Sequence, residues 1–290
     1  MLPTVCCPLP MLDREEYVEQ VYLFKALGER LRENMATQDL LVWIKEEILS
    51  TTRLPMAMDF LAAELKLQGK FSPAMEKLAH YFRPFQTYVV AEAERDRGKF
   101  DIGTALKILE REAQYLADGA TPQGIFLYQF ECLCRNRLGY DRGLEAIAGD
   151  PIFDAAWKEW ILTVRRQVGL IDIADLIYVR SQQYPIDCRR QGREEAIGDK
   201  PMLFGQKEGR IALANRKKDP LLLFAALHRQ LGYPAVPRLV PLDLTPEILP
   251  ALIRRMDRLE LRLKLAEEEQ KGGIDLTQFY KPPGREEKGA

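Results

Sequence analysis

The side chains best suited to chemistry in this sequence include only two histidines. His80 lies four residues after Glu76, so on a helix the two would share one face and could bind a metal or act as an acid–base pair. The alternative is a surface glutamate beside a histidine half-buried against Tyr81 or Phe82. A carboxylate-bridged di-iron site needs a second Glu/His pair, which the sequence lacks. We interpret His228 as an ordinary helix residue, and we expect no catalytic residue and no metal site.

The cysteines are spaced unfavourably for zinc. Their number is odd, and none are separated by the two to four residues that are usual between zinc ligands. A chain of 290 residues also needs no disulfide framework. We expect reduced thiols and no cofactor. The cysteines are Cys6, Cys7, Cys132, Cys134 and Cys188.

The motifs of nucleotide binding and of hydrolase chemistry are absent. The segment GQKEGR at 205–210 lacks the Lys-Ser/Thr pair of a phosphate-binding loop, and neither GxGxxG nor GxSxG occurs. The leading hypothesis is therefore a non-enzymatic protein that recognises or assembles other proteins through its surfaces. An enzyme whose site is assembled from residues far apart in the sequence is a further hypothesis, with the stretch from Tyr81 to Tyr88 as a pocket wall.

A basic segment supports an alternative hypothesis, nucleic-acid binding. Residues 185–230 hold ten Lys or Arg against six Asp or Glu, so a loop there could bind phosphates. Aromatic side chains for base stacking are scarce, because Phe204 and Phe224 are better interpreted as core residues. The other interpretation is a solvated loop. The candidate phosphate-binding residues are Arg189, Arg190, Arg193, Arg216, Lys217 and Lys218.

The overall charge points to neither nucleic acid nor membrane. Lys and Arg number 42 against 43 Asp and Glu, which gives a net charge of −1. No apolar stretch approaches the roughly 18 residues that a membrane span requires. The first twelve residues, MLPTVCCPLPML, lack the basic region of a signal peptide and contain three prolines. We expect a cytoplasmic protein, for which both Met1 and Met11 are candidate start residues.

Apolar residues at three- and four-residue steps predict a helical domain over 13–171. Five pairs of an oxygen-bearing residue and proline predict helix starts, because such a residue can cap the first turn and proline needs no donor there. Within 73–97, Pro84 should bend or divide the helix and leave a groove. The five pairs are Ser72-Pro73, Thr121-Pro122, Asp150-Pro151, Asp219-Pro220 and Thr245-Pro246.

Three stretches repeat one pattern, in which a glycine is followed within two residues by an aromatic ring and then by a second helix. They cover 67–81, 96–110 and 136–150. A glycine can end a helix in the left-handed conformation, and the ring can pack into the corner. The pattern resembles the turns of stacked helical-hairpin proteins such as the tetratricopeptide class, over about a third of the chain. The spacing is unequal, so an irregular helical domain that reuses a common turn is the alternative.

We expect residues 172–238 to form a small α+β unit. The β-branched and aromatic run 173–179 is interpreted as a strand, and 202–216 as an antiparallel hairpin. The polar stretch 184–201 is interpreted as an exposed loop, and 220–231 as a helix that covers the sheet. The expected fold is thus mainly α: an irregular multi-helix body, helical-hairpin or solenoid-like, with a β-hairpin unit and a C-terminal heptad-patterned helix.

The C-terminal region offers a second surface for partners. Residues 239–271 should form a proline-rich connector and an amphipathic helix, whose heptad seam suits self-association or docking on another helix. We expect residues 1–12 and 272–290 to be disordered. The tail carries apolar anchors that suit a groove in a partner. The candidate partner-binding residues are Leu252, Met256, Leu259, Leu263, Phe279 and Tyr280.

Overall fold

The computed structural model describes residues 12–31, 36–95, 100–193 and 200–238, together with 256, 259 and 260. Contacts divide the chain into two compact units, 1–239 and 240–290. Within the described residues the protein is mainly α, with thirteen named helices and only isolated β-bridges. None of these helices has the length and apolar character needed to cross a membrane.

These thirteen named helices belong to the first unit. They are α1 (Arg14–Arg30), α2 (Thr37–Glu47), α3 (Leu54–Gln68), α4 (Ser72–Lys77), α5 (Pro84–Ala93), α6 (Ile102–Ala117), α7 (Pro122–Arg135), α8 (Tyr140–Ala148), α9 (Ala155–Gln167), α10 (Ile173–Val179), α11 (Gln183–Arg190), α12 (Gln206–Ala214) and α13 (Pro220–Leu231).

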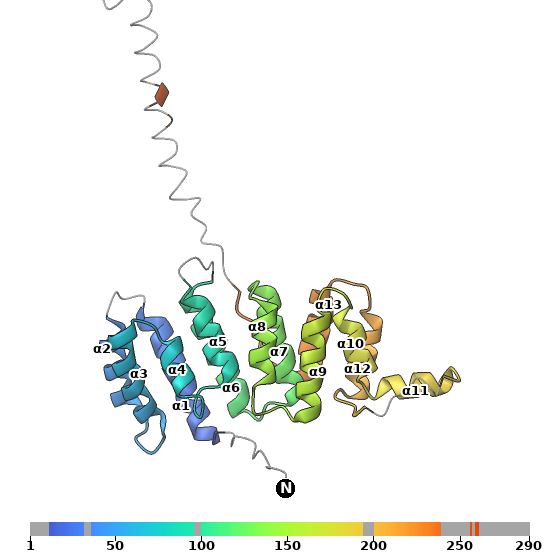
Figure 1. Cartoon of the computed structure of the whole chain (residues 1–290), viewed down its shortest axis with the longest axis horizontal. Helices are drawn as coiled ribbons and strands as arrows, with labels where there is room; N and C mark the ends of the chain where they lie inside the picture. Colours follow the sequence, from blue (N-terminus) through green and yellow to red (C-terminus); the bar gives the residue numbers. More distant parts are fainter. Residues whose placement is uncertain are drawn as a thin grey trace, which may run out of the picture. The chain divides into compact units, whose positions relative to one another are not determined.

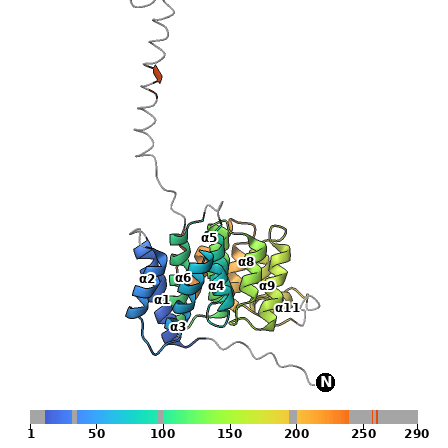
Figure 2. The same cartoon turned by 60° about the vertical axis from the view of Figure 1, so that its left-hand side comes forward.

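Most helices of this unit pack in two layers (Figures 1 and 2). One layer runs through α1, α6, α7 and α13, and the other through α3, α4, α5, α8 and α9. Helix α2 packs on α3 and α1 at one end, whereas α10 and α12 pack together near α13 at the other. The most extensive helix pair is α1 with α6, which are far apart in the sequence. The layers are therefore not a simple succession of hairpins between neighbouring helices.

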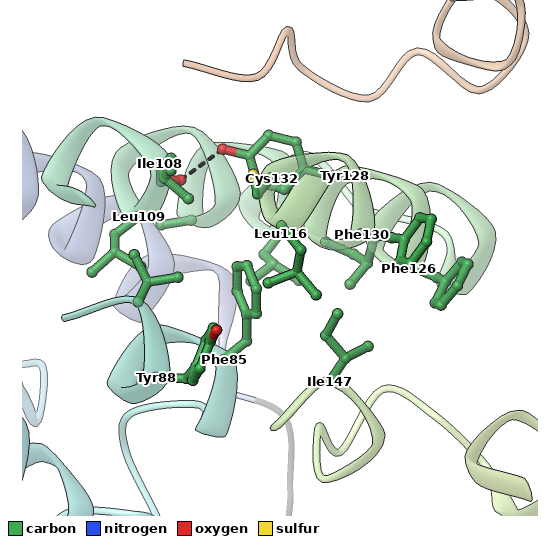
Figure 3. Close-up of a cluster of buried hydrophobic side chains, with 14 of the residues drawn as sticks. Phe85, Tyr88, Ile108, Leu109, Leu116, Phe126, Tyr128, Phe130, Cys132 and Ile147 are labelled. Carbon is green, nitrogen blue, oxygen red and sulfur yellow. Dashed lines mark hydrogen bonds between the residues drawn. The ribbon is translucent and has the colours of Figure 1, made fainter. Parts of the chain in front are cut away.

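The hydrophobic core lies between the layers (Figure 3). Phe85 of α5, Phe126 of α7 and Ile147 of α8 all contribute to this region, and all three side chains are fully buried. The Tyr128 hydroxyl donates to the Ile108 carbonyl at 2.8 Å, which satisfies a polar group inside this apolar region. Burial of these faces is what holds the amphipathic helices together.

Three of the five predicted helix starts are confirmed and one is wrong. At Ser72-Pro73, α4 begins at Ser72 itself, so Ser72 belongs to the helix and does not cap it. Thr121 accepts from the Gly124 amide at 3.2 Å, and Asp219 accepts from the Leu221 amide at 2.8 Å. Asp150 does not start a helix. Its side chain is buried and pairs with Arg83. Helix α9 begins five residues later, and its cap is Asp154. The pair Thr245-Pro246 lies outside the described residues.

The prediction that Pro84 divides its segment is confirmed. Helix α4 ends at Lys77, and α5 begins at Pro84, which occupies the first turn where no amide donor is needed. His80 therefore lies in the connection and does not share a helical face with Glu76, so that expectation is wrong.

The repeated glycine pattern does not correspond to one kind of turn. Gly69 ends α3 with a left-handed φ of 69°, as expected. Gly139 instead has a φ of −65° and precedes α8. The left-handed residue there is Arg137, and the Leu138 amide donates back to the Leu133 carbonyl at 3.0 Å. The third glycine, Gly98, lies outside the described residues.

The predicted strand at 173–179 is wrong, because this segment is helix α10. Asp172 caps it by accepting from the Ala174 amide at 3.0 Å. The buried side chains recur at helical spacing, and it is this spacing, more than β-branched composition, that decides the structure. They are Ile173, Ala174, Ile177 and Tyr178.

The predicted hairpin at 202–216 is also wrong, and with it the α+β unit. Only Phe204 makes a β-bridge, to Ser181, and the expected turn at 206–209 is the first part of α12. Gly209 is needed for packing, because a Cβ there would lie 2.1 Å from Ser181 Oγ. The segment 184–201, predicted to be an exposed loop, contains most of helix α11. Helix α13 has the predicted bounds but covers α12 and α7 instead of a sheet.

Candidate functional site

The connection before Pro84 and the helix after it line a groove. Helix α5 forms its base, with α4 and α8 on either side, since α5 packs against both. The groove has a volume of about 430 Å³, within the range of ligand-binding sites. Its apolar lining residues are Ala79, Phe82, Pro84, Tyr88, Ala91 and Ala146.

Charged side chains of both signs surround this apolar base. Glu92 is paired with Arg95 at 2.8 Å, and Glu145 lies 3.7 Å from Arg165. Glu76 of α4 and Arg142 of α8 also line the groove; both are exposed, and neither forms an ion pair with another described residue. The groove thus offers a carboxylate, Glu76, on one wall and a guanidinium, Arg142, on the opposite wall.

A smaller pocket lies on the other side of the connection. It has a volume of about 90 Å³ and is lined by Tyr17, His80, Arg83 and Pro151, among others. Arg83 is a buried charged residue in its lining, but Asp150 already neutralises this guanidinium at 3.2 Å. The pocket therefore presents no uncompensated cation to a ligand, and the groove is the stronger candidate.

A buried polar network supports the Pro84 connection from inside the protein. Arg83 immediately precedes α5, and its side chain lies against the Tyr17 ring and pairs with Asp150. Gln129 of α7 donates to Asp150 at 3.3 Å and to Glu112 of α6 at 2.6 Å. These contacts connect three helices to the Asp150 turn.

Two further glutamines extend the network to α1. Gln86 accepts from the Arg83 amide at 3.1 Å and donates to Gln20 at 3.2 Å. Gln20, Gln86 and Glu112 are fully buried, so each contact is made without competition from water. The Pro84 connection, and with it the groove, is thereby fixed relative to both layers.

The carboxyl group of Glu112 has an unusual environment. Burial raises its pKa to about 7, against a lowering effect of Arg83, and the nearby Asp150 raises it further. Its Oε2 atom, Gln129 Oε1 and Gln20 Nε2 have no hydrogen-bond partner among the described residues. A proton on Glu112, or an internal water, is the usual way to satisfy such atoms.

Burial and charge act in opposite directions on Arg83. Burial alone lowers the pKa of the guanidinium, but the Asp150 carboxylate and Tyr17 raise it overall. Arg83 therefore stays charged, and the ion pair is a permanent feature of the interior.

The sequence analysis missed this network. Its helical members, Gln20, Gln86, Glu112 and Gln129, lie on the buried stripes of their helices, where an apolar residue is expected: Gln129, for example, lies between Phe126 and Phe130. A polar residue on an apolar stripe was the available signal. The pairing could not be predicted, because the partners come from segments far apart in the sequence.

The structure leaves the candidate phosphate-binding residues in two groups. Arg189 and Arg190 end α11, and Arg193 follows; all three are exposed. Arg216, Lys217 and Lys218 follow α12, and none of the described contacts joins one group to the other. Arg216 pairs with Asp175 and lies over the Tyr178 ring. These two contacts partly neutralise its positive charge.

The other candidate residues are distributed as follows. Met256 and Leu259 are exposed, whereas Leu252, Leu263, Phe279 and Tyr280 lie outside the described residues.

The His228 ring packs edge-on against Tyr233, as suits a helix residue. Cys132, Cys134 and Cys188 are free thiols, and burial raises the pKa of Cys132 well above its usual range. Among the described residues, no group of three His, Cys, Asp or Glu could hold a metal ion.

Comparisons of the chain with protein-family models, with curated proteins and with solved structures found no match.

Proposed function

We propose that this protein is a non-enzymatic interaction protein that binds a peptide segment of a partner protein in the groove between α4, α5 and α8. The observation that carries the proposal is the groove itself, which combines a volume of about 430 Å³ with an apolar base and charges on both walls. A peptide offers the matching chemistry: an apolar side chain for the base and charged neighbours for the walls.

The charges also suggest which peptide fits. Glu76 and Arg142 lie on opposite walls and have no ion-pair partner among the described residues. We expect a bound peptide to carry a basic residue on the α4 side of its apolar anchor and an acidic residue on the α8 side. Such pairing sets the direction of the peptide more than its affinity.

The buried ion pair that supports the groove suits a binding role. Arg83 and Asp150 are almost fully buried, at 4% and 0% side-chain exposure, and hold the Pro84 connection in one position. A site that is already shaped before binding loses less conformational entropy when the ligand arrives. The two layers of helices would then act as the scaffold that presents the groove.

The groove favours this function over the two alternatives. Nucleic-acid binding would need the two basic groups around α11 and α12 to act together, and Arg216 is already paired with Asp175. An enzyme that works through a nucleophile and a general base would need a Ser, Cys or His side chain in the groove, and none is among the residues that line it.

A random peptide library displayed on phage tests the proposal. The library is selected against the wild-type protein and against the variant Ala91→Trp, which fills the base of the groove. We expect peptides with an apolar anchor between a basic and an acidic residue, retained by the wild type and lost by the variant. The matched control is Ala225→Trp on the exposed face of α13, which should retain them.

A charge exchange sharpens the result. In the double variant Glu76→Arg, Arg142→Glu, the selected peptides should reverse the order of their charged residues. Failure to enrich any peptide for the wild type over Ala91→Trp would reject the groove as the binding site. Circular dichroism and a thermal melt of each variant separate loss of binding from loss of fold.

A further inference from the structure

The outer face of α2 carries an exposed apolar pair that the fold does not use. Val42 and Trp43 are 52% and 63% exposed, although the opposite side of the helix is buried through Leu40, Leu41 and Ile44. In both views α2 lies at the end of the row of helices (Figures 1 and 2), so no described helix of the unit covers this face.

Contacts on both flanks fix α2 with this face outward. Lys45 donates to Asp59 of α3 at 2.7 Å on one side, and Glu47 pairs with Arg30 of α1 at 2.8 Å on the other. The face between them is therefore oriented by the fold and is not the result of a loosely attached helix.

Acidic residues lie at both ends of the apolar pair. Asp39 is one turn before Trp43, and Glu46 is one turn after Val42, so the four side chains share one face at helical spacing. Neither carboxylate forms an ion pair with another described residue. The separation of seven positions between Asp39 and Glu46 corresponds to about 10 Å along the helix axis.

We propose that this face binds an amphipathic helix of a partner protein, in which apolar side chains lie between two basic residues about seven positions apart. Apolar contact with Trp43 and Val42 supplies the centre of the interface, since tryptophan is the residue type most enriched at energetically dominant interface positions. Asp39 and Glu46 then pair with the two basic residues and fix the register.

The two carboxylates argue against three other ligands of this face: a second copy of the chain, nucleic acid and anionic lipid. A second copy that pairs symmetrically through α2 would bring Asp39 and Glu46 against carboxylates of the same kind. Nucleic acid and anionic lipid carry negative charge and would be repelled by the same two residues. This surface is separate from the groove, and the proposal does not rest on the proposed function.

The test uses a displayed library of helical peptides with randomised surface positions, selected against the full chain. We expect enriched peptides to carry two Lys or Arg seven positions apart around apolar residues. Their affinity should fall at least tenfold with Trp43→Ala and with the double variant Asp39→Lys, Glu46→Lys. The matched control Leu222→Ala changes a 54% exposed residue on α13 and should leave affinity unchanged.

Three outcomes would overturn the proposal. They are enrichment of peptides without basic residues, equal binding by Trp43→Ala, and a wild-type dimer in light scattering that Trp43→Ala dissolves. Because Trp43 is exposed, its replacement should leave the thermal midpoint unchanged, so lost binding cannot be attributed to unfolding. The groove variant Ala91→Trp should bind these helical peptides normally, which separates failure here from failure of the proposed function.

Discussion

Two neighbouring parts of the interior are built in opposite ways. Around Arg83, polar and charged side chains from α1, α5, α6 and α7 form a connected network at 4% exposure or less. Around Trp160, aromatic rings from α7, α9 and α13 meet, for example Phe126 with Trp160 at 4.7 Å between ring centroids. Helix α7 belongs to both parts, through Gln129 on one side and Phe126 on the other.

The difference teaches how each part contributes to the fold. The aromatic part gains free energy in proportion to the apolar area that it buries, so every ring that is removed costs stability. The polar part gains little net free energy, but it tolerates only one arrangement of its partners. The aromatic part therefore supplies stability, and the polar part fixes α5, the helix that forms the base of the groove.

The largest expected effect comes from the aromatic part. Trp160→Ala should lower the free energy of unfolding by about 5 kcal/mol, at the top of the range for buried aromatic residues, because three neighbouring rings lose their contact. Urea denaturation measures the change. Trp43→Ala is the matched control, since this ring is 63% exposed and its loss should change stability by less than about 0.5 kcal/mol. Similar values for both tryptophans would contradict the comparison.

The polar part should respond to a single change but tolerate a paired one. Asp150→Asn leaves the Arg83 guanidinium buried without its counter-charge and should cost about 4 kcal/mol. The double variant Arg83→Met, Asp150→Asn should be more stable than Asp150→Asn alone, because no uncompensated charge remains. A double-mutant cycle in urea gives the coupling energy. Additive losses would show that the ion pair is not the source of the effect.

The pH dependence of stability tests the same network through Glu112. Its pKa is about 7 in the folded protein and 4.5 as the reference value for the unfolded chain. The folded state thus binds the proton more tightly, so the stabilisation is complete below pH 4.5 and is lost as the pH rises through 7. The loss should be at most about 3 kcal/mol.

Glu112→Gln provides the matched variant for this titration. The amide can still accept from Gln129 Nε2, and like the protonated acid it is neutral and carries a donor. We expect the variant to lose this part of the pH dependence and to be more stable than the wild type at pH 8. Parallel stability curves for the two proteins would show that Glu112 does not titrate in this range.

The helices were predictable where spacing and end signals agreed. The start of α2 at Thr37 and both ends of α13 follow from apolar spacing, and from Asp219 before Pro220. Helix α10 was misread because its β-branched residues were weighed above their helical spacing. Composition is the weaker signal, since burial can override intrinsic propensity.

The groove was predictable in part, but the buried ion pair of Arg83 and Asp150 that supports it was not. A break at Pro84 indicated a hollow beside it, because proline cannot continue the preceding helix. Asp150 followed by proline matched a helix start, but the buried guanidinium of Arg83 drew the carboxylate inward. Such long-range pairing leaves no periodic signal in the sequence.

The smallest expected effect tests how closely the aromatic part is packed at its edge. A Cβ on Gly209 of α12 would lie 2.1 Å from Ser181 Oγ and 2.7 Å from Gln183 Cβ, next to the bridge that Ser181 makes with Phe204. Gly209→Ala should therefore cost about 2 kcal/mol in urea denaturation, because the neighbouring backbone must move. Adding Ser181→Gly should recover part of the loss by removing the nearest atoms. Gly69→Ala is the control: its φ is +69° with nothing within 4 Å, so only backbone strain of about 1 kcal/mol is expected. If Gly209→Ala proved harmless, α12 would be free to shift, and the aromatic part would be packed less closely than its ring contacts indicate.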